Sequence, residues 1–358
     1  MNKTIAKHQL VQETSPTKKI ERIARICYKS EDRITEGSDF QMIKSLVSRK
    51  HMAMMEHADV CIEVDAATYD FMETMQGLIT KHIRKNDKES KRCYLRFSKY
   101  FIESEKLNNN AHVYAPARRL ISGNMRAWAE TFEELEQMDS LMPEICTAVV
   151  DAAGGNTGAL YQFYGHGSDM SHQEFFKDKK IEVNIINDFS LLSKEERMLH
   201  ETLTILFTCD RGITHELVRM RECSFAQEST RYCNYGIQAK HNGEIMVINP
   251  CFFEDGTEAY YEWEQAMIDA EKHYLRLTRD LKVPAQQARS VLPHSTKVDI
   301  AMTANLREWK HIFELRACDS TGPCHPQMSE IMRPCLRDVR ELYPFAFGDL
   351  VTPDEVLS

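Results

Sequence analysis

The stretch that most constrains this chain runs from Arg211 to Gly236 and contains arginine without lysine. Five arginines and no lysine fall between Lys194 and Lys240. Four arginines and four acids stand between Asp210 and Tyr232, so the segment is not a basic patch that binds through summed charge. Arginine without lysine favours bidentate recognition of phosphate or carboxylate, because the planar guanidinium offers parallel donors. Structural Arg–Glu pairing on a solvated face is the alternative.

A spaced set of residues lies inside this stretch. Arg219-Met-Arg221 is followed, after seven residues, by Ser229 and then by Arg231-Tyr232. This pattern resembles the signature of the flavin-dependent thymidylate synthases, which reads Arg-His-Arg, seven residues, Ser, x-Arg-Tyr. Ser224 is also in register, whereas Met220 takes the place of the central histidine.

Two further blocks follow the family's order. The segment from His51 to Glu56-His57 resembles its upstream His-x-x-x-x-Glu-His element. Downstream, Ala288-Arg289-Ser-Val-Leu-Pro293 precedes Asn305-Leu-Arg307, His311 and Leu315-Arg316, in an order similar to the family's last blocks. Three blocks in the right order make the resemblance strong, although each block alone is weak.

The resemblance implies a function and a set of site residues. A member of this family would convert dUMP to dTMP with FAD as cofactor, methylenetetrahydrofolate as one-carbon donor and NADPH as reductant, in a homotetramer. Arg316, expected to polarise the uracil, and Ser229 are the catalytic candidates. The nucleotide is expected to contact Glu216, Arg219, Gln227, Glu228, Ser229, Arg231, Arg289 and Arg316. The flavin is expected to contact His51, Ala53, Glu56, Arg219, Met220, Arg221, Gln227, Asn305, Arg307 and His311.

Departures from the family pattern keep other functions open. Met220 removes a hydrogen-bond donor, Ala53 lacks a hydroxyl often found at its position, and Glu216 stands where glutamine is frequent. A second hypothesis is therefore a flavoenzyme that transfers a different group to a pyrimidine nucleotide. A third is a non-catalytic nucleotide- or RNA-binding protein, for which the aromatic and basic run from Arg92 to Tyr100 is the one supporting patch.

Ser229 can be interpreted in two ways. It could act as a nucleophile, but a serine hydroxyl is weak without an activating base. No histidine stands near it in the sequence. A binding role is therefore favoured.

Composition limits the class of protein and its partners. The net charge of −9 argues against stable binding to nucleic acid or to an anionic membrane. The sequence contains no long apolar run, and its first residues lack the apolar core of a signal peptide. Eleven cysteines without a Cys-x-x-Cys pair indicate a reducing cytoplasm. Cys318, Cys324 and His325 are interpreted as structural residues, and no metal site is expected.

The expected fold is mixed α/β and not of the Rossmann type, because no GxGxxG follows a strand. Residues 1–64 and 203–358 are assigned to the catalytic domain, and 65–202 to a partly helical insertion. Within the insertion, Ser122-Gly-Asn-Met-Arg-Ala-Trp128 echoes Thr303-Ala-Asn-Leu-Arg-Glu-Trp309. This echo is either a degenerate copy of the flavin-contacting element or a coincidence.

Periodicity and end signals predict the local structure. Helices are expected over 17–29, 38–50, 66–85, 122–138, 213–220, 258–282, 305–316 and 327–342, with a short one from Pro284. Strands are expected over 60–64, 203–209, 246–248 and 296–303. Residues 91–104 are expected to be extended, and 154–180 to form an irregular loop.

Overall fold

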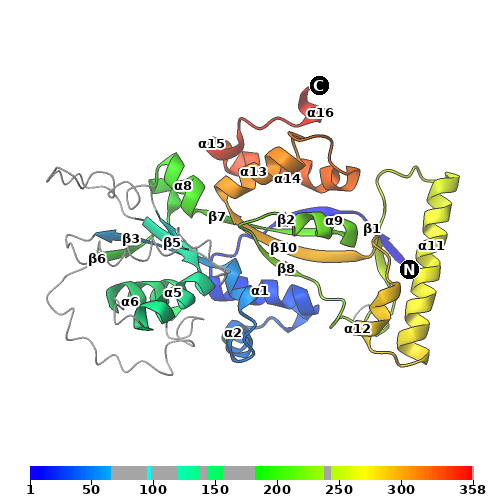
Figure 1. The fold of residues 1–358 in the computed structure, drawn as a ribbon, viewed down its shortest axis with the longest axis horizontal. Coiled ribbons are helices and arrows are strands. Elements are labelled where there is room, and N and C mark those ends of the chain that lie inside the picture. The colour runs from blue at the N-terminus through cyan, green and yellow to red at the C-terminus, as the bar shows by residue number, and fades with distance from the viewer. Residues whose placement is uncertain (66–94, 98–119, 138–142, 156–181, 238–242, 357–358) are drawn as a thin grey trace. The chain divides into compact units, whose positions relative to one another are not determined.

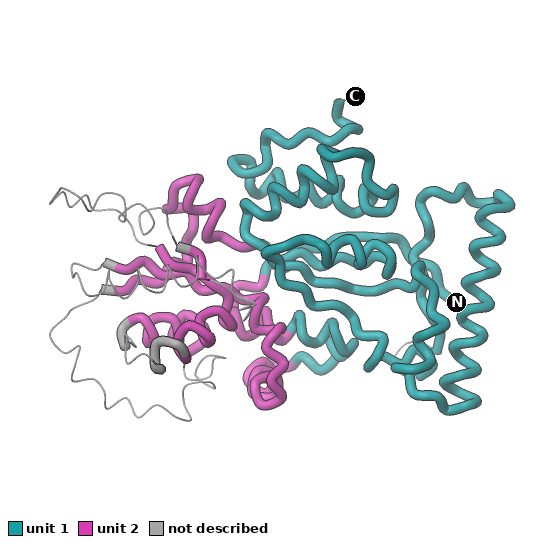
Figure 2. The backbone as a smooth tube through the Cα atoms, in the orientation of Figure 1, with its two compact units in different colours: residues 1–12, 22–34, 203–358 teal, residues 13–21, 35–202 magenta. Residues whose placement is uncertain are grey.

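The computed structural model describes residues 1–65, 95–97, 120–137, 143–155, 182–237 and 243–356. The chain divides into two compact units (Figure 2). Unit 1 comprises residues 1–12, 22–34 and 203–358, and unit 2 comprises 13–21 and 35–202. Unit 1 is therefore built from segments that are distant in sequence.

The elements of the structure follow in chain order. The strands are β1 (Asn2–Thr4), β2 (Lys7–Leu10), β3 (Asp59–Asp65), β4 (Arg96–Phe97), β5 (Leu120–Asn124), β6 (Glu182–Ile185), β7 (Thr202–Asp210), β8 (Ser224–Gln227), β9 (Met246–Ile248) and β10 (Lys297–Asn305). The α-helices are α1 (Pro16–Tyr28), α2 (Ser38–Ser48), α5 (Met125–Gln137), α6 (Pro143–Ala152), α8 (Lys194–His200), α9 (Arg211–Leu217), α11 (Glu258–Leu275), α12 (Ala285–Ala288), α13 (Leu306–Arg316), α14 (Pro326–Leu342), α15 (Pro344–Phe347) and α16 (Pro353–Val356). Short 3₁₀ turns are η1 (Glu31–Arg33), η2 (Met52–His57), η5 (Phe189–Leu191) and η7 (Arg289–Val291), and η6 (Arg276–Asp280) is a π-helical turn.

Unit 1 is organised around a four-stranded sheet in the order β2-β7-β10-β8 (Figure 1). β2 pairs antiparallel with β7, and β8 pairs antiparallel with β10. Seven of the nine residues of β7 and eight of the nine of β10 are buried, as expected for central strands with both faces covered. α13 and α14 pack together, and α14 also packs against β2. A separate parallel pair, β1 and β9, lies beside the long helix α11.

Unit 2 contains a second four-stranded sheet, in the order β4-β5-β3-β6. Each strand of this sheet pairs antiparallel with its neighbours. α5 packs against β5 and η2, and α6 packs against β3 and β6. Trp128 and Phe132 of α5 are almost fully buried and contact each other at 5.7 Å between ring centroids. This sheet and α5 therefore share one apolar core.

Side-chain caps explain where several helices begin. Asp210 accepts the backbone N–H of Ile213 at the start of α9, and Thr257 accepts that of Tyr260 at the start of α11. Ser193 and Glu196 form a reciprocal capping box at α8. Each cap satisfies an N–H that the first helical turn leaves without a partner.

The structure confirms the mixed α/β fold and most of the predicted elements. It places the predicted strand 246–248 and the end of the helix at Arg316 at the expected residues. The helix predicted over 122–138 was wrong at its start, because Leu120–Asn124 form a buried strand and the helix begins at Met125. The predicted helix 258–282 stops at Leu275 and continues as a π-helical turn.

Some predictions fall outside the described ranges. These are the helix over 66–85, the loop over 156–180, and most of the extended segment 91–104, of which Arg96–Phe97 is a strand. Within the described part of the chain, no helix is long and apolar enough to cross a membrane.

Candidate functional site

The C-terminal end of α13 contacts α9 in unit 1 through an ion pair. Arg316 Nη1 lies 3.3 Å from Glu216 Oε2. The Nε of Arg316 is buried and has no hydrogen-bond partner among the described residues. On the same helix α9, the hydroxyl of Thr214 accepts a hydrogen bond of 3.1 Å from Gln227 Nε2. α9 therefore joins three residues predicted for the nucleotide: Glu216, Gln227 and Arg316.

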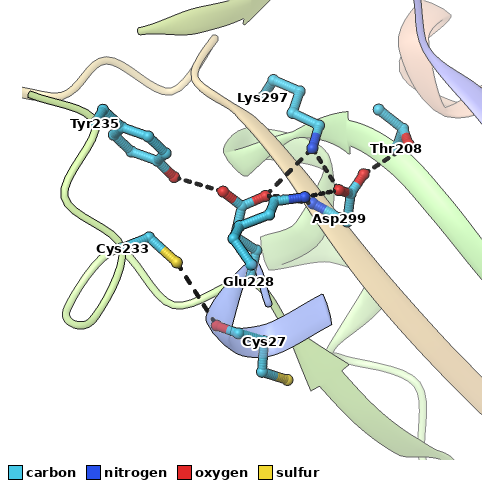
Figure 3. Close-up of polar contacts among 8 residues, drawn as sticks. Cys27, Thr208, Glu228, Cys233, Tyr235, Lys297 and Asp299 are labelled. Carbon is cyan, nitrogen blue, oxygen red and sulfur yellow. Dashed lines mark hydrogen bonds and ion pairs between the residues drawn. The ribbon is translucent and has the colours of Figure 1, made fainter. Parts of the chain in front are cut away.

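Glu228, the next residue of the motif, points into the protein (Figure 3). Its carboxylate accepts the Tyr235 hydroxyl at 2.9 Å and lies 3.2 Å from Lys29 Nζ and 3.3 Å from Lys297 Nζ. Asp299 forms ion pairs with the same two lysines. The hydroxyl of Thr208 donates to Asp299 at 2.7 Å. These residues form a buried network of two carboxylates and two ammonium groups, which is the pairing that a buried charge requires.

The same network fixes the backbone of the motif. Glu228 N–H donates to the carbonyl of Asp299 at 2.8 Å, and Asp299 N–H donates to the Glu228 carboxylate at 3.2 Å. A phosphate bound by the Glu228 N–H would have to displace the first of these bonds. Glu228 is therefore placed to hold the motif loop in position from inside, whereas its predicted contact with the nucleotide stays a prediction.

The environment shifts the pKa of three members of the network. Burial would raise the pKa of Asp299, but the charges of Lys297 and Lys29 outweigh it and lower the pKa to about 2. Burial opposes the charge of Lys29, yet Glu228 and Asp299 raise its pKa. Burial, followed by the charge of Glu228, raises the pKa of Tyr235 well above its ordinary value. At neutral pH Asp299 and Lys29 are thus charged and Tyr235 is a neutral donor.

We expect Asp299 to make part of the stability depend on acid pH. Its folded pKa of about 2 lies below the ordinary value of 3.8, so its contribution is present above the unfolded pKa and is lost as pH falls through the folded pKa. The difference in melting temperature between wild type and Asp299→Asn should stay constant above roughly pH 5 and shrink between about pH 4 and 2. Thermal melts across that range measure it, and a difference independent of pH would contradict the assignment.

The loop after β8 carries Ser229 and Arg231. Ser229 N–H donates to the carbonyl of Cys27 at 3.0 Å, so the end of α1 anchors the loop. The Ser229 hydroxyl accepts the Arg231 N–H at 3.3 Å, and Arg231 Nε donates to Gln286 on α12 at 3.3 Å. No histidine hydrogen-bonds to the Ser229 hydroxyl in the described part of the chain. This geometry suits a binding loop and not a nucleophile with an activating base.

A second group of predicted residues surrounds the start of α13. Asn305 caps this helix by accepting the Glu308 N–H at 2.8 Å, as the sequence predicted. Arg307 and His311 are exposed on the next turns. Burial and then the charge of Glu222 raise the pKa of Glu308, which places the loop after Arg221 near this turn. Asn305, Arg307 and His311 therefore lie on the first turns of one helix, whereas Gln227, also predicted for the flavin, contacts α9.

The remaining flavin candidates lie in unit 2. Ala53 and Glu56 belong to η2, and His51 immediately precedes it. Glu56 Oε1 lies 2.8 Å from Arg126 Nη1, and Arg126 Nε lies 2.7 Å from Glu130. The Glu56 carboxylate is thus neutralised within its own unit. His51, Ala53 and Glu56 stay predicted flavin contacts.

The arginines of unit 1 could hold an anionic group. Of the six arginines predicted for the nucleotide or the flavin, five are exposed and have no carboxylate within 4.0 Å in the described part of the chain: Arg219, Arg221, Arg231, Arg289 and Arg307. Unpaired guanidinium groups are suited to phosphate and pyrophosphate. Within the stretch from Lys194 to Lys240, the alternative of internal Arg–Glu pairing therefore holds for Arg197, which lies 2.8 Å from Glu201. It does not hold for Arg219, Arg221 and Arg231.

Sequence reasoning missed Lys29, Lys297 and Asp299. Lys297 and Asp299 are two residues apart on β10, so their side chains share one face of the strand, which is a signal that was available. Lys29 follows the end of α1 with φ of +47°. Its contact with residues about 200 and 270 positions later could not be inferred from local pattern.

The sequence of this chain is similar to those of known proteins. The family model for thymidylate synthase complementing protein matches residues 9–146 and 159–345. A flavin-dependent thymidylate synthase from Pyrococcus abyssi is 35% identical over 128 residues, covering 35% of this chain and 50% of that protein. One from Pyrococcus furiosus is 34% identical over 162 residues, covering 45% and 64%. The chain thus spans about half to just under two thirds of the length of these curated relatives.

A solved structure is also similar in part. It is the UMP/dUMP methylase PolB from Streptomyces cacaoi bound with 5-Br UMP, with a TM-score of 0.34 and 21% identity over 41% of this chain and 72% of that chain. The family match, in contrast, covers most of the sequence. The chain therefore belongs to the thymidylate synthase complementing protein family, whose relatives named above are flavin-dependent thymidylate synthases.

Proposed function

We propose that this protein is a flavin-dependent thymidylate synthase that converts dUMP to dTMP. The one-carbon donor is methylenetetrahydrofolate, the reductant is NADPH and the cofactor is FAD. The observation that carries the proposal is Arg316, whose half-buried guanidinium faces Glu216 and keeps a buried Nε without a partner among the described residues. It ends the helix that Asn305 begins, as the motif order requires.

The residues of unit 1 fit a flavin dinucleotide. Arg219, Arg221 and Arg307 are exposed cations without carboxylate partners in the described ranges, and they are suited to a pyrophosphate. When bound, the reduced flavin would relay the one-carbon unit and supply hydride, which is chemistry that amino acid side chains lack. The protein then contributes position and electrostatics.

The nucleotide would be held by the loop after β8. Arg231 and Arg289 would contact the phosphate dianion, while Ser229 hydrogen-bonds to it. Arg316 would donate to a uracil oxygen and stabilise the negative charge that develops on the ring. Glu216 would hold that guanidinium in place, because the ion pair of 3.3 Å fixes its orientation. The buried Glu228 would hold this loop in position through its hydrogen bonds to Asp299.

We further propose the assembly and location of the enzyme. Its partners would be a nucleotide and a folate, and it would act as a cytoplasmic homotetramer. The net charge of −9 supports small-molecule partners over stable nucleic-acid or membrane binding. Analytical ultracentrifugation would test the assembly, and a monomer at working concentration would contradict it.

The visible spectrum of the purified protein tests the proposal most directly. We expect a yellow protein with a flavin absorption band that NADPH bleaches under anaerobic conditions. Incubation with dUMP and methylenetetrahydrofolate should then yield dTMP, detected by mass spectrometry. A colourless protein that takes up no FAD would exclude a flavoenzyme and favour a non-catalytic binding protein. A bleached flavin without dTMP would favour transfer of another group.

A further inference from the structure

The sheets of the two units have the same strand order. Read from the matching edge, unit 1 is β2-β7-β10-β8 and unit 2 is β6-β3-β5-β4. Along the chain, the eight strands fall into two successive sets of four. Each set begins with an edge strand, followed by the first central strand, the strand at the opposite edge and the second central strand. β2, β3, β4 and β5 form the first set, and β6, β7, β8 and β10 form the second. An Asn-capped helix follows the last strand of each set.

The first edge strand has the same register in both sheets. In unit 1, Leu10 pairs with Ile205 and His8 with Phe207. In unit 2, Ile185 pairs with Ile62 and Val183 with Val64. The next bond also recurs, since Val11 N–H donates to Thr204 at 3.0 Å and Ile186 N–H donates to Cys61 at 2.9 Å. Each paired residue of β2 corresponds to the residue of β6 that lies 175 positions later. Each paired residue of β3 corresponds to the residue of β7 that lies 143 positions later.

The far edge shows the same correspondence. Phe225 pairs with Met302 in unit 1, and Phe97 pairs with Ile121 in unit 2. One residue earlier, Ser224 pairs with Thr303 and Arg96 pairs with Ser122. A single shift of 128 residues for β4 to β8 and of 181 for β5 to β10 covers both pairs.

The helix that follows repeats in side-chain detail. Asn305 Oδ1 accepts the Glu308 N–H at 2.8 Å, and Asn124 Oδ1 accepts the Ala127 N–H at 2.9 Å. The indole of Trp309 donates to Leu203 on β7 at 2.9 Å.

Trp128 repeats that bond by donating to Val60 on β3 at 3.1 Å, and the two acceptors are related by the same shift of 143. Each tryptophan also contacts a phenylalanine four residues later, Phe313 or Phe132. A chance echo of seven residues would not reproduce these remote partners.

We propose that the chain is an internal duplication of the family's sheet and helix, in which the two copies exchange their first strands and only unit 1 keeps the anion site. β2 begins the first copy but pairs with β7 of the second, and β6 begins the second copy but pairs with β3 of the first. The family match is interrupted at residues 147–158, between the two sets of strands. The segment 65–202 is then the remainder of one copy and the start of the next.

The second part of the proposal concerns the cations. Arg307, in unit 1, is exposed and has no carboxylate partner among the described residues. Its counterpart Arg126 is 15% exposed and is held by Glu56 and Glu130 at 2.8 and 2.7 Å. Ser224 of the motif is replaced by Arg96, which donates to Asp59 and to Ser122. Internal carboxylates thus neutralise Arg96 and Arg126, which stand at the positions of Ser224 and Arg307, so these two described positions of unit 2 do not offer an anion site.

Thiol cross-linking tests the strand exchange. Gln9 and Asn184 are exposed and their partners Leu206 and Glu63 are half-buried, so double cysteine variants should fold. A short thiol-specific cross-linker should join the cysteines in Gln9→Cys/Leu206→Cys and in Asn184→Cys/Glu63→Cys, as mapped by mass spectrometry. The matched pairs Gln9→Cys/Glu63→Cys and Asn184→Cys/Leu206→Cys should remain unjoined. Joining in the matched pairs instead would overturn the exchange.

Proline variants give an independent readout. Val11→Pro removes the N–H that bonds to β7, and its counterpart Ile186→Pro removes the one that bonds to β3. By hydrogen exchange, Val11→Pro should expose β7 and leave β3 protected, and Ile186→Pro should do the reverse. The opposite pattern would mean that each edge strand stays with its own copy.

Titration with FAD tests the loss of the second site, a step that rests on the proposed function. We expect one FAD per chain. Arg307→Ala should weaken binding about tenfold or more, whereas Arg126→Ala should lower the melting temperature and leave the stoichiometry at one. Two FAD per chain, or equal losses of affinity in the two variants, would contradict the proposal that only unit 1 keeps the anion site. Absence of FAD binding would contradict the proposed function instead, and the cross-links would still decide the duplication.

Discussion

Asp299→Asn is expected to lower the free energy of unfolding by about 3 kcal/mol at neutral pH. The substitution keeps the oxygen that accepts the Thr208 hydroxyl but removes the charge shared by Lys29 and Lys297. The network then holds two ammonium groups against Glu228 alone. Those lysine side chains are 19% and 13% exposed, so water compensates only part of the lost interaction. Urea unfolding followed by circular dichroism measures the loss.

A double variant controls for the effect of shape. Lys297→Met/Asp299→Asn removes one charge of each sign and leaves the Lys29–Glu228 pair of 3.2 Å. Because the network is neutral again, the double variant should be more stable than Asp299→Asn alone. A single variant as stable as wild type, or a double variant less stable than the single one, would show that water solvates the network.

Arg316→Ala is expected to lower kcat by a factor of roughly 100 to 1,000, the effect of removing one donor to a developing oxyanion. Arg316 is assigned to the uracil and not to the flavin, so the bound flavin and its spectrum should be unchanged. The free enzyme should stay folded, because the lost ion pair with Glu216 is 25% and 37% exposed and contributes little to stability. Steady-state kinetics and the flavin spectrum of the same sample measure both effects.

A second arginine provides the matched control. Arg340 is paired with Glu355 at 2.7 Å and is exposed to a similar degree, 24%, but it belongs to none of the family blocks. Arg340→Ala should therefore retain nearly wild-type kcat. Loss of flavin in Arg316→Ala would place this guanidinium at the cofactor, and equal activity of the two variants would remove it from the reaction.

The sequence could predict those parts of the fold that depend on local signals. Asn305 was expected to cap the last motif helix, and the strand 203–209 was expected from its continuous apolar and β-branched run; both are confirmed. The start of α5 was misplaced because Ser122-Gly-Asn124 were assigned to a helix. In the structure they form a buried strand, where pairing with β3 outweighs local preference.

The candidate site could be predicted only where residues match the motif. The exposed arginines and the Asn305 helix came from spacing. The role of Glu228 as a buried anchor did not, because its partners Lys29 and Asp299 are far away in sequence. Likewise, the similarity of Ser122–Trp128 to Thr303–Trp309 could be recognised from the amino-acid sequence. The bonds to Val60 and Leu203, which distinguish a copy from a coincidence, require the folded chain.

The pairing of β2 with β7 also determines when the protein can fold during synthesis. His8 pairs with Phe207, roughly two hundred residues later, so the two strands that pair in the sheet of unit 1 are widely separated in sequence. β2 leaves the ribosome early, and its backbone N–H and C=O groups stay unpaired until β7, β8 and β10 have been synthesised. Nascent chains of this protein should therefore depend on chaperones until translation passes Asn305, and separately expressed halves should each lack a strand that the other supplies.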